Sequence, residues 1–194
     1  MRRHLVIMLK EPRAGRVKTR LGRDIGMTAA AWWFRHQTRA LIRHLDDRRW
    51  NTSLAITPDR AATASRAWPA HLPRIAQGPG DLGARMLRIF RGFPPGPVII
   101  VGSDIPGMTA AHIDRAFRKL GTHDAVFGPA TDGGFWLIGL KRSAPPPRGL
   151  FSQVRWSSEH ALADTLATLP DRRIALVDRL QDVDTGADLA ALSA

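Results

Sequence analysis

The chain has 194 residues, of which 44% are hydrophobic and 24% are charged. These values exclude a disordered chain and suit one globular domain over residues 1–194. No apolar run approaches the ~20 residues that a membrane span needs. Cysteine is absent, which rules out disulfides and thiolate ligands, leaves oxygen or imidazole to hold any metal, and favours a cytoplasmic location.

The chain is strongly basic, with a net charge of +12 from 29 basic and 17 acidic residues, and most of the basic residues are arginine. Two interpretations remain open. The planar arginine fork suits phosphate, which favours an anionic substrate or a nucleic acid. Alternatively, the arginines reflect genomic base composition, because they are spread along the chain and form no single block.

Predicted strands alternate with predicted helices, and no internal repeat is present. In chain order we expect a strand at 4–9, a helix at 28–45 capped by Thr28, a strand at 53–57, a helix at 59–68, a short strand at 74–77, a helix within 78–93, a buried strand at 98–103, a helix at 109–121, strands at 124–130 and 135–140, a helix at 158–169 and a strand at 173–177. This alternation is typical of an α/β fold, here a three-layer α/β/α sandwich with a mainly parallel mixed sheet.

Four aspartates follow predicted strands: Asp104 after 98–103, Asp132 after 124–130, and Asp182 and Asp184 after 173–177. Ligands of such folds bind beyond the carboxyl ends of the strands, so we expect all four at one edge of the sheet. Asp104 with Asp184 or Asp182 would suit Mg²⁺, which takes one or two carboxylates plus substrate phosphates. A single aspartate in such a place is more often a helix cap or turn former, and that alternative stays open.

A basic segment, K-E-P-R-A-G-R-V-K-T-R at 10–20, follows the first predicted strand. It lacks both the phosphate-loop pattern and G-x-G-x-x-G, so neither a P-loop nucleoside triphosphatase nor a dinucleotide enzyme is supported. One interpretation is a flexible loop whose cations hold phosphate oxygens. The other is a solvated surface loop.

The stretch T-D-G-G at 131–134 lies between two predicted strands and also has two interpretations. Asp-Gly is the strongest short-range signal for a hairpin turn. In the functional interpretation, Asp132 offers a carboxylate to a ligand at the end of the strand, while Gly133 and Gly134 let that ligand approach the backbone.

Six motifs occur in order along nearly the whole chain: K-x-P-x-x-G-x-x-K-T-R-L at 10–21, LGARM at 82–86, GSDIPGM at 102–108, GPATDGGFWLIGL at 128–140, FSQVRWSS at 151–158 and DVDTGADL at 182–189. With them the sequence resembles the glycosyltransferase-like proteins related to the guanylyltransferase of the deazaflavin cofactor pathway. It is similar to the transferases associated with radical-SAM and selenium-domain neighbours, also labelled arsenosugar biosynthesis glycosyltransferases.

The resemblance implies a GT-A-type nucleotide-diphospho-sugar transferase fold and a requirement for Mg²⁺ or Mn²⁺. Asp104 and Asp184 would hold the metal, and Asp104, Asp132 and Lys18 would take part in catalysis. The nucleotide-binding residues would be Lys10, Arg16, Lys18, Arg20, Gly102, Ser103, Gly133 and Gly134. The chain departs from its relatives at Phe135, where tyrosine is usual, and at Ser158, where threonine is usual.

The predicted function is metal-dependent transfer of a sugar from a nucleotide donor to a small-molecule acceptor. Nucleotidyl transfer to a phosphorylated small molecule is the alternative, disfavoured because 10–20 lacks G-x-G-x-R. A basic nucleic-acid-binding module is a third hypothesis, against which stands the absence of a recognition motif. The oligomeric state stays open: A-A-A-W-W-F at 29–34 could form a dimer contact, although core burial is expected. Trp156 is expected in the core or a lid.

Overall fold

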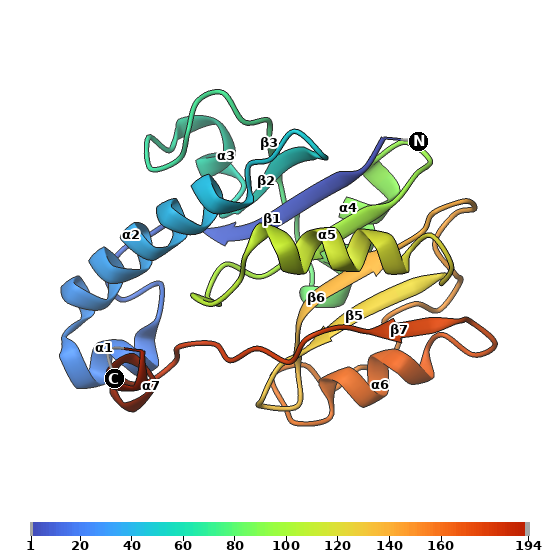
Figure 1. The fold of residues 1–194 in the computed structure, drawn as a ribbon. Helices are drawn as coiled ribbons and strands as arrows, with labels where there is room; N and C mark the ends of the chain where they lie inside the picture. The colour runs from blue at the N-terminus through green and yellow to red at the C-terminus, as the bar shows by residue number, and fades with distance from the viewer. Residues whose placement is uncertain (1, 193–194) are drawn as a thin grey trace.

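The structure, a computed structural model, describes residues 2–192 and is built on one seven-stranded sheet (Figure 1). The strands are β1 (His4–Lys10), β2 (Asn51–Thr57), β3 (Arg74–Ala76), β4 (Val98–Val101), β5 (Ala125–Pro129), β6 (Phe135–Leu140) and β7 (Ile174–Leu176). Their order across the sheet is β3-β2-β1-β4-β6-β5-β7. Only β6 runs antiparallel to its neighbours β4 and β5, so the prediction of a mainly parallel mixed sheet is confirmed.

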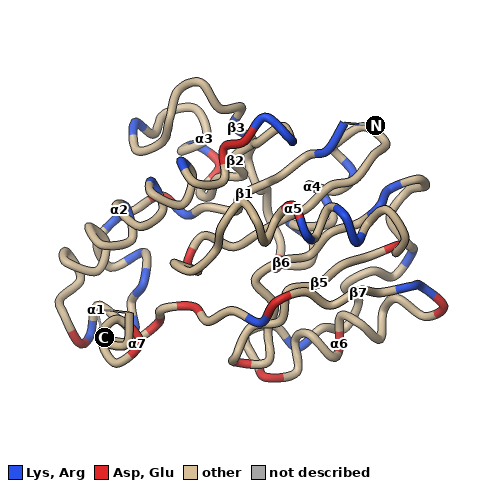
Figure 2. Tube along the Cα trace, in the orientation of Figure 1, with Lys and Arg blue, Asp and Glu red and all other residues tan. Residues whose placement is uncertain are grey.

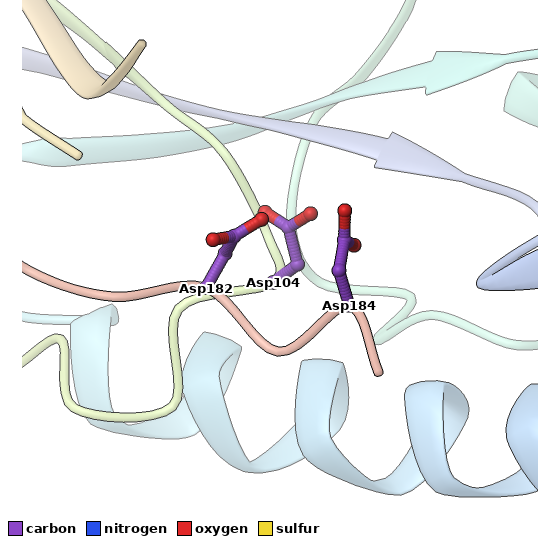
Figure 3. Close-up of side chains that lie close together, drawn as sticks. All are labelled: Asp104, Asp182 and Asp184. Atoms are coloured by element: carbon purple, nitrogen blue, oxygen red, sulfur yellow. The ribbon is translucent and has the colours of Figure 1, made fainter. Parts of the chain in front are cut away.

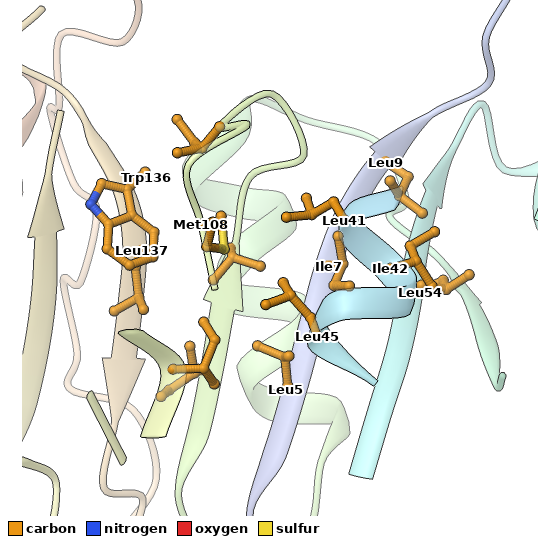
Figure 4. Packing of buried hydrophobic residues seen from close by; sticks show 14 of the residues in the cluster. Leu5, Ile7, Leu9, Leu41, Ile42, Leu45, Leu54, Met108, Trp136 and Leu137 are labelled. Carbon is orange, nitrogen blue, oxygen red and sulfur yellow. The ribbon is translucent and has the colours of Figure 1, made fainter. Parts of the chain in front are cut away.

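Helices cover both faces of this sheet, because its central strands bury side chains on both sides. The helices are α1 (Thr19–Ile25), α2 (Met27–Leu45), α3 (Arg60–Ala64), α4 (Leu82–Gly92), α5 (Ala110–Lys119), α6 (Ala161–Ala167) and α7 (Gly186–Ala191). One buried cluster joins α2 and α5 to the sheet, and a second joins α4 and α6 to the opposite face. Figure 4 shows Leu41, Ile42 and Leu45 of α2 against β1 and β2. The three-layer sandwich is therefore confirmed.

Several predicted helix boundaries are wrong. The helix predicted at 28–45 begins at Met27 with Gly26 at its N-cap, so Thr28 is not the cap. The helix predicted at 59–68 is only Arg60–Ala64, because the guanidinium of Arg74 donates to the carbonyls of Ser65 and Trp68 and holds that segment as a loop. The helix predicted at 158–169 is shortened to α6, and α1 and α7 were not predicted.

The aromatic residues at 29–34 do not share one environment. Phe34 is buried, and Trp33 packs partly against the core. Trp32 is 64% exposed, so core burial of this residue is wrong; its ring instead stacks near that of His36. Trp156 is half-buried and packs against the cluster that includes α4 and α6, as expected for a core or lid residue.

The carboxyl ends of the parallel strands form the edge of the sheet that carries the predicted site residues. Asp104 lies three residues beyond β4. After β7, the chain passes along the same edge: Leu180 N–H donates to the carbonyl of Pro129, the last residue of β5, and Val183 N–H donates to Asp104 O. The last segment thereby brings residues 182–184 beside Asp104. No helix within residues 2–192 is long and apolar enough to cross a membrane.

Candidate functional site

Three of the four predicted aspartates form one cluster. Asp104, Asp182 and Asp184 each offer a carboxylate oxygen, and these oxygens lie within 4.8 Å of one another. Figure 3 shows the three side chains rising from two separate segments toward a common point. The sequence predicted that all four aspartates gather at one edge of the sheet; Asp104, Asp182 and Asp184 form a cluster there, whereas Asp132 lies in the β5–β6 turn and is not part of that cluster.

Lys18 supplies the cation of this cluster. Its Nζ donates to Asp104 Oδ2 at 2.9 Å and to Asp184 Oδ1 at 2.7 Å, and its side chain is only 6% exposed. The residue lies at the N-cap of α1 with φ 45°, a left-handed conformation that is uncommon for lysine. Burial opposes the positive charge, but the carboxylates of Asp104 and Asp184 outweigh it and raise the pKa of Lys18.

Helix α1 holds the second acidic segment in place. Arg20 Nη1 donates to Asp184 Oδ2 at 3.0 Å, and Asp24 Oδ2 accepts from Gly186 N–H at 2.7 Å. Part of the segment predicted to be a flexible basic loop is therefore helical from Thr19 onward, and it contacts the chain end that carries Asp184. These contacts connect residues about 160 positions apart in the sequence.

Asp182 differs from its two neighbours because no described side chain or backbone donor bonds its carboxylate. Burial first, and then the charges of Asp184 and Asp104, raise its pKa from 3.8 to about 6. Three carboxylates thus face Lys18 and the exposed Arg20, which leaves an excess of negative charge. The all-oxygen donor set and this excess fit a hard divalent cation such as Mg²⁺ or Mn²⁺.

A cavity of about 670 Å³ opens beside the cluster. Among the predicted site residues it is lined by Lys10, Arg16, Lys18, Arg20, Gly102, Ser103, Asp104 and Asp184. It also has apolar walls from Met8, Phe34, Leu82 and Phe135. The structure therefore brings the cationic segment after β1 and the acidic edge to the same space.

Asp132, Gly133 and Gly134 do not line this cavity. They form the β5–β6 hairpin turn, in which Asp132 Oδ1 accepts from Gly134 N–H at 2.9 Å. Gly133 has φ +85°, and a Cβ there would lie 2.2 Å from Glu159 O. The glycine requirement at 133 thus comes from close packing of two backbone segments. Asp132 is exposed, yet its charge contributes to the raised pKa of Asp182.

Gln77 is a cavity residue that the sequence did not single out. It directly follows β3, which the sequence predicted to extend to residue 77, and its side chain is buried against the ends of β1 and β2. Its position at a carboxyl strand end is the signal that could have identified it.

A larger cavity of about 1100 Å³ lies at the opposite edge, where β1 and β2 begin at His4 and Asn51. Basic residues likewise do not mark a single face, since they lie on many elements in Figure 2. The clustered carboxylates at the carboxyl edge, rather than volume or net charge, define the candidate site.

The fold is that of the nucleotide-diphospho-sugar transferases and nucleotidyltransferases. The chain belongs to the family described as "Uncharacterized protein conserved in bacteria (DUF2064)", which matches residues 40–158. No curated protein is significantly similar to it.

Three solved structures illustrate the similarity. A protein of Desulfovibrio desulfuricans G20, provisionally assigned as a nucleotide-diphospho-sugar transferase, is 28% identical, with a TM-score of 0.86 over 99% of this chain and 87% of that one. CMP:2-keto-3-deoxy-manno-octonic acid synthetase, solved with CTP, is 13% identical, with a TM-score of 0.61 over 99% and 97%. Rv0371c of Mycobacterium tuberculosis H37Rv, solved with manganese, is 15% identical, with a TM-score of 0.55 over 99% and 98%. The last two show the fold alone.

Proposed function

We propose that this protein is a metal-dependent transferase that uses a nucleotide-activated donor and transfers a glycosyl group to a small-molecule acceptor. The observation that carries the proposal is the cluster of three carboxylates around buried Lys18, beside a cavity lined by further cations. The sequence motifs and the provisional assignment of the 28% identical structure support the nucleotide-sugar donor. Within this class, the motifs favour the group related to the deazaflavin-pathway guanylyltransferase and the transferases labelled for arsenosugar biosynthesis.

The donor diphosphate would lie between the cluster and the cationic segment after β1. Asp104 and Asp184 would hold a divalent ion, which when bound neutralises the charge of the diphosphate leaving group. Lys18 would donate to a phosphate oxygen, and Lys10 and Arg16 would bind the outer phosphate oxygens across the cavity. Gly102 leaves the backbone beside Ser103 open to the ligand.

The transfer forms one bond and breaks one. The acceptor oxygen bonds to the anomeric carbon, the bond from that carbon to the diphosphate oxygen breaks, and its electron pair leaves with the nucleoside diphosphate. The acceptor proton passes to a carboxylate, for which Asp132 is our candidate because only one of its oxygens is used in the hairpin turn. Asp132→Asn should then lower kcat with little change in donor affinity.

Nucleotidyl transfer is the second candidate, because a buried cation at Lys18 would also stabilise charge on an α-phosphate. In that reaction an acceptor phosphate oxygen attacks the α-phosphorus and pyrophosphate leaves. The two reactions differ in the released product, which is a nucleoside diphosphate in one and pyrophosphate in the other.

Thermal denaturation with nucleoside triphosphates, nucleoside diphosphates and nucleotide sugars, each with and without Mn²⁺ or Mg²⁺, tests the proposal. A ligand that binds only the folded protein raises Tm by mass action. We expect metal-dependent increases with nucleotide sugars and diphosphates. Increases with triphosphates alone would move the assignment to nucleotidyl transfer, and no increase with any nucleotide would contradict both.

A further inference from the structure

The junction of α1 and α2 carries an exposed apolar cluster. Six large apolar side chains within residues 2–192 are exposed, and three of them lie together here: Ile25 at 37%, Met27 at 38% and Trp32 at 64%. These three line one open hollow of about 580 Å³ on the surface. Exposed apolar side chains that occur singly are normal, but a group that gathers in one place marks a surface that contacts a partner.

The exposed side of α2 beyond this cluster is basic. No acidic residue occurs in 25–45. Arg35 and Arg43 are exposed and lie three and eleven positions beyond Trp32, so all three side chains follow one side of the helix. Unlike Arg49 at the amino edge, neither arginine pairs with a carboxylate in the part of the chain that the structure describes. The outer surface of α2 therefore combines an apolar end with unneutralised positive charge.

This combination selects among the possible partners. In a two-fold contact with a second copy, both sides are the same surface, so the arginines of α2 would face one another and repel. A nucleic acid would attract the arginines, but its charged backbone offers no apolar surface to Ile25 and Met27. A bilayer with anionic lipids suits both parts, because its headgroups attract arginine while the layer below them accepts tryptophan and aliphatic side chains.

We propose that the apolar cluster and the arginines of α2 form a docking surface for a membrane that contains anionic lipids. Trp32, Met27 and Ile25 enter the interface below the headgroups, and Arg35 and Arg43 contact lipid phosphates. Tryptophan is well suited to this position because its ring is apolar and its N–H stays among the polar headgroups.

Helix α1 connects this surface to the candidate site. Lys18 lies at the N-cap of α1 and Ile25 is its last residue, and Figure 1 shows α1 beside the N-terminal end of α2. A helix of this length spans about 10 Å, so a docked bilayer lies close to the carboxylate cluster. The inference adds a place of action to the proposed function but depends on neither the donor nor the reaction.

Vesicle binding of the full chain tests the proposal, without nucleotide or divalent ion and at physiological salt. Sedimentation is compared for vesicles of phosphatidylcholine alone and of phosphatidylcholine with about 30% phosphatidylglycerol. We expect the mixed vesicles to bind about tenfold or more strongly, since each arginine at the surface adds to the attraction. Equal binding to both kinds of vesicle, or binding to neither, would overturn the proposal.

Trp32→Ala tests the apolar part of the surface. Alanine favours the helix and the replaced side chain is exposed, so α2 should be retained, as far-UV circular dichroism can check. Binding to the mixed vesicles should weaken about tenfold. The matched control is Leu176→Ala, which removes an apolar side chain that is 55% exposed on β7 and should leave binding within about twofold. Equal effects of the two substitutions would contradict the proposal.

Arg35→Gln combined with Arg43→Gln tests the basic part. Because the whole chain carries a net charge of +12, any anionic surface attracts it to some extent. The control therefore removes the same charge elsewhere, by Arg91→Gln in α4 combined with Arg148→Gln, both at exposed positions. We expect the α2 pair to weaken binding about fivefold for each arginine and the control pair by less than about twofold in total. Equal losses would show that net charge alone drives binding.

Two further measurements identify the other partners if the proposal is wrong. A dimer in sedimentation velocity that forms with rising concentration and is lost in Trp32→Ala would assign the surface to a second copy. Single-stranded RNA that binds more tightly than the mixed vesicles, and whose binding depends on Arg35 and Arg43 but not on Trp32, would assign it to a nucleic acid. Either result would overturn membrane docking, whatever the outcome of the nucleotide experiments.

Discussion

The two edges of the sheet carry charged side chains in different states. At the amino edge, where β1 and β2 begin, Asp46 contacts His71, and Asp47 accepts from the Arg49 side chain at 2.9 Å through both of its oxygens. At the carboxyl edge, three carboxylates share Lys18 and Arg20, and Asp182 has no bonded partner among residues 2–192. The amino edge has the larger cavity, yet among residues 2–192 three carboxylates converge only at the carboxyl edge.

In this protein, unsatisfied negative charge distinguishes the candidate binding site better than cavity size does. At the amino edge, Asp47 has its own arginine and Asp46 contacts a histidine, so neither carboxylate is left without a partner. At the carboxyl edge, three carboxylates share two cations, and their mutual repulsion destabilises the protein in the absence of a ligand. Such unfavourable arrangements are typical of functional sites, where a bound ligand removes the repulsion. Four predictions, in order of decreasing effect, test this difference between the two edges.

The largest expected effect comes from Asp104→Ala. Removal of a metal ligand should weaken Mn²⁺-dependent nucleotide binding by more than about 100-fold, the upper range seen for the outer partners of such ligands. Titration calorimetry measures the affinity, and far-UV circular dichroism checks the fold. Asp47→Ala at the amino edge is the matched control and should leave this affinity unchanged. Nucleotide affinity that survives Asp104→Ala would show that the cluster is not the metal site.

Lys18→Met should destabilise the metal-free protein. It leaves Asp104 and Asp184 facing each other without their shared cation, and a buried charge that loses its partner is costly. The two carboxylates are 38% and 35% exposed, so solvent screening reduces the cost. We expect about 1–2 kcal/mol, which corresponds to a Tm lowered by ~3–6 °C for a chain of this size.

A more specific test of the role of Lys18 is to measure the Tm of Lys18→Met by calorimetry with and without Mn²⁺. A divalent ion can take the place of the lost ammonium, so Mn²⁺ should raise Tm more in the variant than in the unaltered protein. The control at the amino edge is Arg49→Met, which leaves the carboxylate cluster intact, so Mn²⁺ should raise its Tm by the same amount as in the unaltered protein. A smaller Mn²⁺ effect in Lys18→Met than in the unaltered protein would contradict the arrangement.

Asp182 should make the metal-free protein less stable as pH rises. Its folded pKa of about 6 lies above the unfolded value of 3.8, so the folded state binds more protons between these values. Stability therefore falls from about pH 4 to pH 6 and stays reduced above that range. Asp182→Asn should raise Tm at pH 7.5 by about 3 °C, which corresponds to ~1 kcal/mol after a discount for partial exposure. It should have little effect at pH 4.

Asp47 at the amino edge gives the opposite sign. Hydrogen bonds from the Arg49 side chain and backbone lower the pKa of Asp47 to about 2. Its contribution to stability is present above pH 4 and is lost as pH falls toward 2. Asp47→Asn should therefore lower Tm at neutral pH. Melting curves of both variants from pH 3 to 8 in EDTA give the comparison, and shifts of the same sign would remove the distinction between the edges.

The smallest effect is expected for Arg20→Gln. The Arg20 side chain is 67% exposed, and exposed ion pairs contribute about 0–1 kcal/mol. We expect Tm to change by less than about 3 °C and 0.5 M NaCl to mimic the substitution. A loss of stability as large as that of Lys18→Met would show that the exposed and buried cations of the cluster act as one unit.

Local patterns predicted much of the fold. The continuous apolar runs of β1 and β4 identify strands buried on both faces, and Thr109 correctly marks the start of α5. Helix α1 escaped prediction because T-R-L-G-R-D-I has few apolar residues and an internal glycine. Its stability depends on tertiary contacts: Leu21 is fully buried, and a Cβ on Gly22 would lie 2.5 Å from the sulfur of Met27. These tertiary contacts compensate for the weak helix propensity of the segment, and they cannot be recognised from the neighbouring residues in the sequence.

The sequence by itself determined the alternation of strands and helices and, through it, that Asp104 and Asp184 lie at one edge, because parallel strands point their carboxyl ends the same way. Only the tertiary structure decided which groups meet there. Lys18 contacts carboxylates 86 and 166 positions away, and Gln77 is oriented by carbonyls of two other strands. Such contacts depend on the paths of loops in space, whereas sequence patterns record only the neighbours of a residue along the chain.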